Sequence, residues 1–379
     1  MKLAKLALAL SVTTTVSSAA LADITIGVSL SATGPAASLG IPERNAFTLL
    51  PTEIAGEKVK LIVLDDATDP TVATKNTRRL VSEDKVDAII GSSSTPATAA
   101  MAEVAHESKT PLVTMSPVSL PAERNEWVFR TPQQNNVMSG ALIEHMKAKG
   151  VKTLGFIGFS DAYGEDWLNA VSAQATAAGI KLAVVERYNR NDTSVTGQVL
   201  KLVSARPDAV LVAGSGSPAA LPQSTLVERG YKGQIYQTHA AANQSFLSVA
   251  GKAAEGVILP VGPVSVVAQL PDDHPSKASG VQFVKNYEAQ FGAGSFSAFA
   301  GYAHDAYSLI EAAIPAAKAK GEPGTPAFRA ALRDALESSK EVVGVHGVFN
   351  MSPSDHFGLD ARSRVLVRVE GGAYKLVAH

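Results

Sequence analysis

The sequence of 379 residues contains no cysteine. This absence excludes disulfides, thiolate catalysis, iron–sulfur clusters and zinc sites built on cysteine. Charge of one sign is not in excess either, because 34 Lys and Arg face 35 Asp and Glu and leave a net charge of −1. We therefore expect no nucleic-acid partner. With 46% hydrophobic residues the chain can build a large core, and its length favours two domains over one.

Long apolar runs are missing as well. No segment has the roughly 20 apolar residues that a membrane-spanning helix needs, so we expect a chain that does not span the membrane. A shorter apolar run follows Lys2 and Lys5, and Ala20-Leu21-Ala22 then fits the A-x-A pattern of a cleavage site. We interpret residues 1–22 as a cleaved secretory signal peptide that exports the mature chain. Without a cysteine at this site, a lipoprotein anchor is excluded.

The common catalytic signatures are also absent. The sequence has no G-x-S-x-G, H-E-x-x-H or G-x-x-x-x-G-K-[ST] motif. Gly214-Ser215-Gly216-Ser217 loosely resembles a dinucleotide fingerprint, but Tyr236-Gln237-Thr238 stands where such a site needs an acidic residue. Asp65-Asp66 could be a metal pair, although a strand end followed by a helix cap is the simpler interpretation. We expect no catalytic residue, no cofactor and no metal site.

Short apolar runs alternate with helical patterns along most of the chain. The expected strands are residues 24–30, 59–64, 86–90, 112–115 and 128–131, followed by 154–159, 182–186, 209–212, 234–237 and 257–260. The expected helices between them are residues 43–50, 70–83, 95–107, 137–149, 164–178, 195–204, 218–229 and 244–250. Near-continuous apolar strands separated by helices indicate parallel sheets covered on both faces. Because this rhythm occurs twice, we predict two α/β domains.

The last third of the chain has a different pattern. Its periodicity predicts helices at residues 277–291, 299–320 and 326–338. The tail has extended runs at residues 342–349, 364–370 and 374–378, with Gly371-Gly372 as a hairpin signal between the last two. Because the connections are short, we expect these elements to pack on the two earlier domains instead of forming a third.

The loops that follow the expected strands are rich in small hydroxyl residues and glycine. Examples are Gly91-Ser92-Ser93-Ser94-Thr95, Ser116-Pro117-Val118-Ser119 and Gly214-Ser215-Gly216-Ser217. Ligands of open parallel sheets bind outside the carboxyl ends of the strands. Backbone N–H groups at helix N-termini in this position favour an anion such as a carboxylate. These residues could instead be helix caps alone, but their recurrence at several strand ends favours a binding site.

The chain resembles the leucine/isoleucine/valine-binding family, the type I periplasmic binding proteins. The matching segments, in order, are Thr33-Gly34-Pro35, Asp65-Asp66-Ala67-Thr68-Asp69-Pro70, Ile89-Ile90-Gly91-Ser92-Ser93-Ser94-Thr95, Ser116-Pro117, Tyr163-Gly164-Glu165 and Ala254-Glu255-Gly256. The resemblance extends over essentially the whole mature chain. It implies a monomeric solute-binding component of an ABC importer, which delivers its ligand to a membrane permease. A sensor that presents its ligand to a receptor and a secreted enzyme are the competing functions.

The resemblance also implies the architecture. Two Rossmann-like lobes would be joined by three chain crossings, and a hinge motion would close them over a ligand. The expected bounds are residues 23–134 and 276–345 for lobe 1, 135–262 and 346–379 for lobe 2, and 263–275 for the crossing segment between them. The third crossing would then fall near residues 345–350.

The binding residues of the family carry over to eight positions. Ser94, Thr95, the Val118 backbone and Ser119 are expected to hold a ligand carboxylate, and Leu39, Tyr163, Ser215 and His239 are expected to surround the rest of the ligand. The amino-acid binders present an acid to the ligand ammonium, but residues 238–243 contain none.

An ammonium without such a partner is unfavourable in a closed cleft. We therefore expect a carboxylate without a required amine, such as a benzoate or a phenylpropanoid. The alternative is a branched-chain amino acid whose ammonium is held by carbonyls, by Asp161 or by Glu165.

Overall fold

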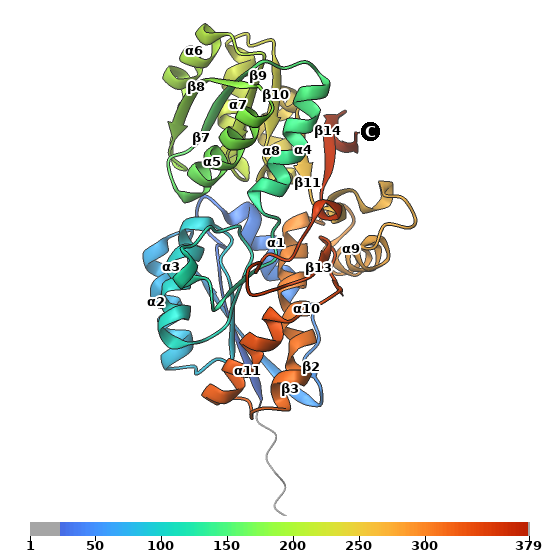
Figure 1. Ribbon diagram of the computed structural model, residues 1–379. Helices are drawn as coiled ribbons and strands as arrows, with labels where there is room; N and C mark the ends of the chain where they lie inside the picture. Colours follow the sequence, from blue (N-terminus) through green and yellow to red (C-terminus); the bar gives the residue numbers. More distant parts are fainter. Residues whose placement is uncertain (1–22, 378–379) are drawn as a thin grey trace, which may run out of the picture.

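The computed structural model describes residues 23–377, so the expected signal peptide at residues 1–22 lies outside the described part. Figure 1 shows two lobes, one above the other, each built around its own sheet. The first sheet has the strand order β2-β3-β1-β4-β5-β6, and the second has the order β15-β14-β11-β10-β9-β7-β8. Both are predominantly parallel, which confirms the predicted α/β fold with two Rossmann-like lobes.

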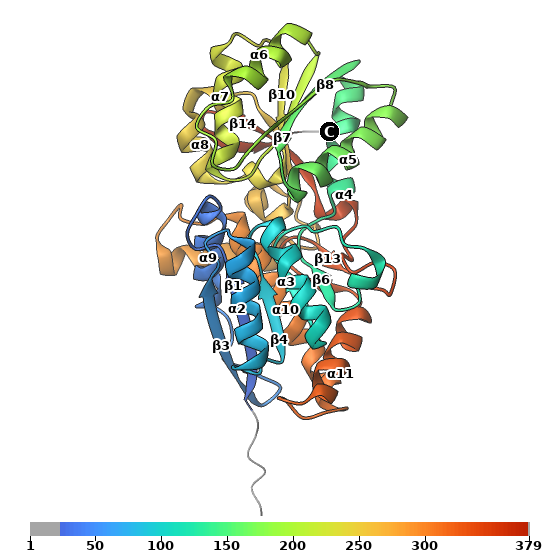
Figure 2. The same ribbon diagram turned by 90° about the vertical axis from the view of Figure 1, so that its left-hand side faces the viewer.

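The first lobe consists of a sheet between two helical layers. Its strands are β1 (Ile24–Leu30), β2 (Glu53–Ile54), β3 (Glu57–Asp65), β4 (Ala88–Gly91), β5 (Leu112–Thr114) and β6 (Val128–Arg130). Helices α2 (Pro70–Ser82) and α3 (Thr95–Ser108) cover one face (Figure 2). The other face packs against α1 (Ala37–Phe47) and α10 (Ala298–Lys318), and α11 (Pro326–Glu337) packs on α10. The late helices therefore complete a lobe that the N-terminal residues begin.

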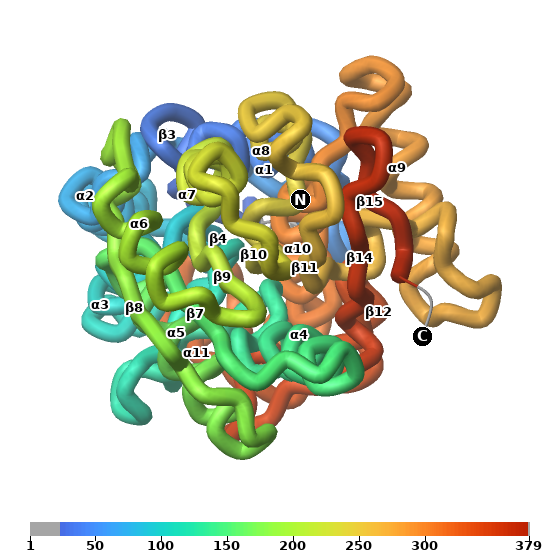
Figure 3. Tube along the Cα trace, turned by 90° about the horizontal axis from the view of Figure 1, so that it is seen from above, coloured from blue at the N-terminus to red at the C-terminus, as the bar shows by residue number. Residues whose placement is uncertain are grey.

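The second lobe repeats this arrangement. Its parallel strands are β7 (Thr153–Phe159), β8 (Lys181–Tyr188), β9 (Ala209–Ala213), β10 (Gln234–Gln237) and β11 (Ile258–Val261). Its helices are α4 (Asn135–Ala148), α5 (Ala162–Ala177), α6 (Thr196–Ala205), α7 (Ala220–Glu228) and α8 (Gln244–Ala250). The predicted C-terminal hairpin, β14 (Val365–Glu370) and β15 (Ala373–Leu376), adds antiparallel to β11, as seen from above in Figure 3.

Local sequence explains where several helices begin. The Asp69 carboxylate accepts hydrogen bonds from the N–H groups of Thr71 and Val72, and Pro70 occupies the first position of α2, as predicted. Helix α1 begins at Ala37, six residues before the expected start. Gly40 looks like a helix breaker in the sequence, but a Cβ there would lie 2.1 Å from the Ser31 carbonyl oxygen. Glycine therefore lets α1 pack closely on the loop after β1.

The third chain crossing lies later than expected. Arg130 N donates to the carbonyl oxygen of His356 at 2.9 Å, and the His356 ring stacks on Phe129 with centroids 4.4 Å apart. The segment at 350–358 therefore still packs on the first lobe. The chain reaches the second sheet only after the short helix Ala361–Ser363. We therefore place the crossing at about 359–364 instead of 345–350, and residues 346–358 in the first lobe instead of the second.

The two remaining parts of the chain are a short strand pair and the segment that follows β11. The expected extended run at 342–349 forms a short antiparallel pair, β12 (Val342–Val343) with β13 (Val348–Phe349). The crossing segment after β11 contains 3-10 helix from Pro263 to Gln269 and leads to α9 (Lys277–Phe291).

Across residues 23–377, no helix combines the length and the apolar character that crossing a bilayer requires.

Candidate ligand-binding site

A small cavity of about 20 Å³, with room for roughly one water molecule, lies between the lobes near the carboxyl ends of strands from both sheets. Small-molecule sites have volumes of roughly 300–1,000 Å³, so this site has to open to admit a ligand. Its wall on the first lobe consists of Leu39, Ser93, Ser94, Thr95, Met115, Ser116, Pro117, Pro132, Phe299 and Tyr302. Its wall on the second lobe consists of Tyr163, Arg190, Ser215, His239 and Ala240. The position is the one that ligands take in open parallel sheets.

Arg190 provides a cationic side chain to this wall, two residues after the end of β8. Its Nε donates to Asp161 Oδ2 at 2.6 Å, its Nη1 donates to Ser215 Oγ at 3.0 Å, and its guanidinium lies 4.2 Å from the centroid of the Phe159 ring. These contacts fix the guanidinium in place. No partner for Nη2 is found among residues 23–377, which leaves this nitrogen free to donate to a ligand anion.

On the opposite wall, the N-terminus of α3 reaches the cavity through Ser94 and Thr95. The Ser94 hydroxyl is buried without a hydrogen-bond partner in the described chain, and it does not cap α3. The positive end of the helix macrodipole is therefore not neutralised by a side chain, which favours a negative ligand group. Thr95 behaves differently from what we expected, because its hydroxyl donates to the Pro117 carbonyl oxygen at 2.7 Å. Its side chain therefore has no proton left for a ligand carboxylate.

Two tyrosines contribute their rings to the cavity and use their hydroxyl groups elsewhere. The Thr238 hydroxyl donates to the Gly214 carbonyl oxygen at 3.0 Å, so Tyr163 OH is the donor in its 2.7 Å bond to Thr238 Oγ1. Tyr302 OH donates to Gln133 Oε1 at 3.2 Å. Phe299 adds a third ring. The apolar part of the wall thus combines these three aromatic rings with the smaller side chains of Leu39, Met115, Pro117, Pro132 and Ala240.

His239 is neutral in this environment. Burial, and to a smaller extent the nearby His346, lowers the pKa of His239 to about 3. Its ring lies 6.5 Å from the Tyr163 ring and 5.8 Å from the Trp167 ring, between centroids. Its Nδ1 has no hydrogen-bond partner in the described part of the chain. The neutral ring can therefore offer one donor and one acceptor to an uncharged polar group of a ligand.

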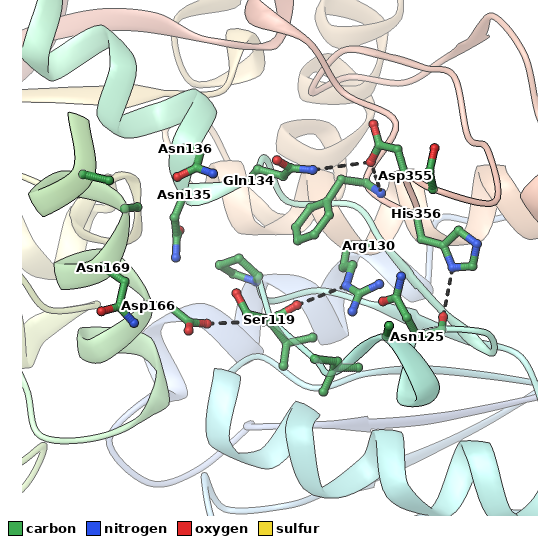
Figure 4. A pocket seen from close by; sticks show the side chains of 18 residues that line it. Ser119, Asn125, Arg130, Gln134, Asn135, Asn136, Asp166, Asn169, Asp355 and His356 are labelled. Carbon is green, nitrogen blue, oxygen red and sulfur yellow. Dashed lines mark hydrogen bonds between the residues drawn. The ribbon is translucent and has the colours of Figure 1, made fainter. Parts of the chain in front are cut away.

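Val118 and Ser119 do not line this cavity. They lie in a neighbouring groove between the lobes, which shares Pro117 with the cavity and is shown in Figure 4. The Val118 carbonyl accepts from Nε of the buried Arg130 at 3.1 Å, and Ser119 N donates across the lobes to Asp166 Oδ2 at 3.3 Å. The expectation that they help to hold the ligand carboxylate therefore does not match their position.

The other six predicted residues line the cavity, but three important neighbours were missed. Leu39, Ser94, Thr95, Tyr163, Ser215 and His239 are brought together as expected. Arg190 was missed because the strand before it was expected to end at 186, whereas β8 extends to Tyr188. A cation just beyond a strand end was the available signal. Phe299 and Tyr302 come from a helix more than 130 residues away from Tyr163, so no local pattern could place them here.

Comparisons with known proteins agree with this architecture. The sequence profile of the family described as "Periplasmic binding protein" matches residues 23–373. A curated relative, the Leu/Ile/Val-binding protein homolog 3 of Brucella melitensis, is 27% identical over 349 residues, which cover 88% of this chain and 89% of the relative. The solved structure of Rp1789 from Rhodopseudomonas palustris has 48% identity and a TM-score of 0.93, and the match covers 94% of this chain and 100% of that one.

More distant structures share the fold but hold different ligands. The branched-chain amino acid substrate-binding protein LivJ of Streptococcus pneumoniae, in complex with isoleucine, has 19% identity and a TM-score of 0.77, with coverage of 94% and 99%. An ABC transporter solute-binding protein of R. palustris, in complex with benzoate, has 21% identity and a TM-score of 0.78, with coverage of 94% and 96%. The fold alone does not select the ligand. From its profile, its relatives and its two-lobed architecture, the chain belongs to the periplasmic binding protein family, in the branch of the Leu/Ile/Val-binding proteins.

Proposed function

We propose that this protein is the solute-binding component of an ABC importer and that its ligand is a small carboxylate with an aromatic body. The observation that carries the proposal is Arg190, a fixed cation in a cavity whose lining includes no acidic residue within the described chain. The guanidinium and the N-terminus of α3 favour a carboxylate. The rings of Tyr163, Phe299 and Tyr302 favour an apolar, flat body.

A ligand ammonium would find no counter-charge in this cavity. Asp161, one of the acids considered for that role, accepts from the N–H groups at the start of α5 and pairs with Arg190. Glu165, the other, pairs with Arg187 through both carboxylate oxygens. Neither lines the cavity. An unpaired ammonium would lose its hydration without compensation, which costs several kcal/mol, so the geometry favours an aromatic acid over a branched-chain amino acid.

Capture and delivery follow from the two-lobed design. A ligand that touches Ser94 on one lobe and Arg190 on the other stabilises the arrangement in which the lobes are close. We infer that a membrane permease recognises the closed arrangement of the lobes and accepts the ligand from it. The location that the family implies, the periplasm, is where such a capture step takes place.

A binding panel tests the proposal. The purified mature chain is titrated calorimetrically with benzoate, 4-hydroxycinnamate, leucine and valine, and the melting temperature is measured with each compound, because a ligand that binds only the folded state raises it. We expect binding of at least one aromatic acid and none of the amino acids. Binding of leucine or valine alone would overturn the aromatic assignment. Binding of none of the four would remove its support and require a different ligand class.

A further inference from the structure

The three segments that connect the lobes meet at one buried point behind the ligand cavity. Gln133 belongs to the first crossing, Gly262 lies at the start of the second, and Ser363 belongs to the third. His346 lies in the first lobe, upstream of the third crossing. Gln133 and His346 are fully buried. A Cβ at Gly262 would lie 2.0 Å from His346 Nδ1 and 2.9 Å from Gln133 Nε2, so the segments are in direct contact.

The Gln133 carboxamide holds this meeting point together. Its Nε2 donates to the Ser363 carbonyl oxygen at 2.8 Å and points to the His346 carbonyl oxygen at 3.4 Å. Its Oε1 accepts from Tyr302 OH at 3.2 Å. Nitrogen facing two carbonyl groups and oxygen facing a hydroxyl group is the only orientation of the amide that satisfies all three contacts. The Gln133 side chain therefore acts as a hydrogen-bond donor and as an acceptor at the same time.

Tyr302 connects this point to the ligand. Its ring lines the cavity and also stacks on the His346 ring, with centroids 3.9 Å apart and planes 12° apart. The His346 ring is fixed in turn, since its Nε2 lies 2.8 Å from the Ala298 carbonyl oxygen and its backbone N–H donates to Asp305 Oδ2 at 2.9 Å. A ligand that presses on the Tyr302 ring thus acts on a side chain that contacts Gln133 of the first crossing and His346, whose ring lies against Gly262.

We propose that Gln133 is a positioning residue for ligand capture. Through Tyr302 it couples the wall of the cavity to the third crossing, so that binding of the ligand and the approach of the lobes occur together. This inference rests on the proposed function, because it needs a ligand in the cavity, but it makes no use of the chemical identity of that ligand. Gln133 itself does not line the cavity.

Paired variants test the coupling. Gln133→Leu removes all three amide contacts, and Tyr302→Phe removes only the hydroxyl group while keeping the ring and its stack. If the loss of one neutral hydrogen bond is felt fully in ligand binding, the affinity falls by roughly two- to tenfold. We expect each single variant to bind the best aromatic acid of the panel more weakly by about this factor. The double variant should bind no more weakly than the weaker single variant, because both changes break the same connection.

A matched control separates positioning from general stability. Gln223 is also a buried glutamine that bonds to a main-chain carbonyl, Ala253 at 2.7 Å, but it lies within the second lobe away from the crossings. Gln223→Leu should lower the melting temperature and leave the ligand affinity unchanged. If Gln133→Leu lowers only the melting temperature, as this control does, the positioning role is excluded.

Distances between the lobes provide the decisive measurement. Because the chain has no cysteine, labels can be attached to Glu123→Cys on the first lobe and Thr176→Cys on the second, both exposed positions. We expect ligand to shift the label distance in the otherwise unchanged chain and to shift it less in Gln133→Leu at saturating ligand. An equal shift in both, or additive losses of affinity in the double variant, would contradict the coupling. If the unchanged chain binds no panel compound, it is the proposed function that fails.

Discussion

Arg187 and Arg190 are three residues apart in the sequence, yet only one of them faces the cavity. Arg187 forms an exposed pair with Glu165, whereas Arg190 is held by Asp161 and Ser215 and only 13% of its side chain is exposed. The difference lies in the environment and not in the residue type. A basic side chain contributes to ligand binding only where its partners leave one donor directed at the ligand.

Replacing each of these arginines separately tests this distinction. A hydrogen bond to a charged group contributes about 1.5–3 kcal/mol, which corresponds to roughly 10- to 150-fold in affinity. We expect Arg190→Gln to weaken binding of the best panel ligand by about this factor in calorimetric titration. Arg187→Gln, the matched control, should bind as tightly as the unchanged chain. Equal affinities of all three proteins would show that the carboxylate is anchored elsewhere.

His239 should make the stability of the fold depend on pH below neutrality. Its folded-state pKa is lowered to about 3 by burial, whereas an unfolded histidine titrates near 6.5. Between these values the unfolded chain binds a proton that the folded chain does not, so stability falls as pH falls through 6.5 toward 3. We expect the unchanged chain to lose up to about 2 kcal/mol more than His239→Gln between pH 6.5 and pH 5.

Urea unfolding of both proteins at these two pH values measures the difference. The same reasoning predicts that His239 remains uncharged from pH 8 to pH 5, so its contribution to ligand affinity should be constant over this range. A loss of stability that is identical in the two proteins would mean that His239 is solvated or paired and titrates near its ordinary value.

At the scale of elements, the junction between β7 and α5 controls where Tyr163 points. Gly164 lies in the first turn of α5, and a Cβ there would be 1.9 Å from the Phe159 carbonyl oxygen. The helix can therefore approach the end of the strand only with glycine at this position. We expect Gly164→Ala to displace the start of α5, and with it Tyr163 and Asp161, and to weaken ligand binding at least tenfold.

The control for this substitution is a glycine with space around it. A Cβ added at Gly197 in α6 would meet no atom within 4 Å, and the backbone there is not left-handed. Gly197→Ala should therefore leave binding unchanged and stabilise the fold by about 0.4–1 kcal/mol. Titration and thermal melting of both variants measure the two effects. If Gly164→Ala binds normally, the close approach of helix and strand is not needed for the site.

The sequence predicts the elements better than it predicts their ends. Every expected strand of the two sheets is present, because continuous apolar runs mark buried parallel strands well. The errors occur where tertiary contacts decide. Helix α1 includes Gly40 and Pro42, which look like breaks in isolation, and β8 continues two residues further than its apolar run. The second error matters more, because Arg190 follows the true end of β8 by two residues and was therefore not predicted as a site residue.

At the scale of the whole molecule, the cavity exists only because distant parts of the chain meet. Leu39 from α1, Arg190 after β8 and Tyr302 from α10 line one space, although the sequence separates them by more than 100 residues at each step. The segment at 350–358 packs on the first lobe through the buried His356. No periodic pattern in the sequence predicts this contact. Local patterns could therefore predict the lobes and many lining residues, but not the complete wall of the site.

Because the site is shared, its ligand should protect both lobes to the same extent. Unfolding of either lobe removes one wall, Ser94 after β4 or Ser215 after β9, and releases the ligand. A ligand at 100 times its dissociation constant stabilises the folded state by about 2.7 kcal/mol. Some amides of β4 and β9 exchange only when their lobe unfolds. The free energy of this opening, measured by hydrogen exchange with and without the best panel ligand, should therefore rise by the same amount in both strands. In Arg190→Gln at the same ligand concentration, the gain should shrink equally in both strands. A gain confined to one lobe would place the ligand within that lobe, and the cavity between the lobes would then not be the binding site.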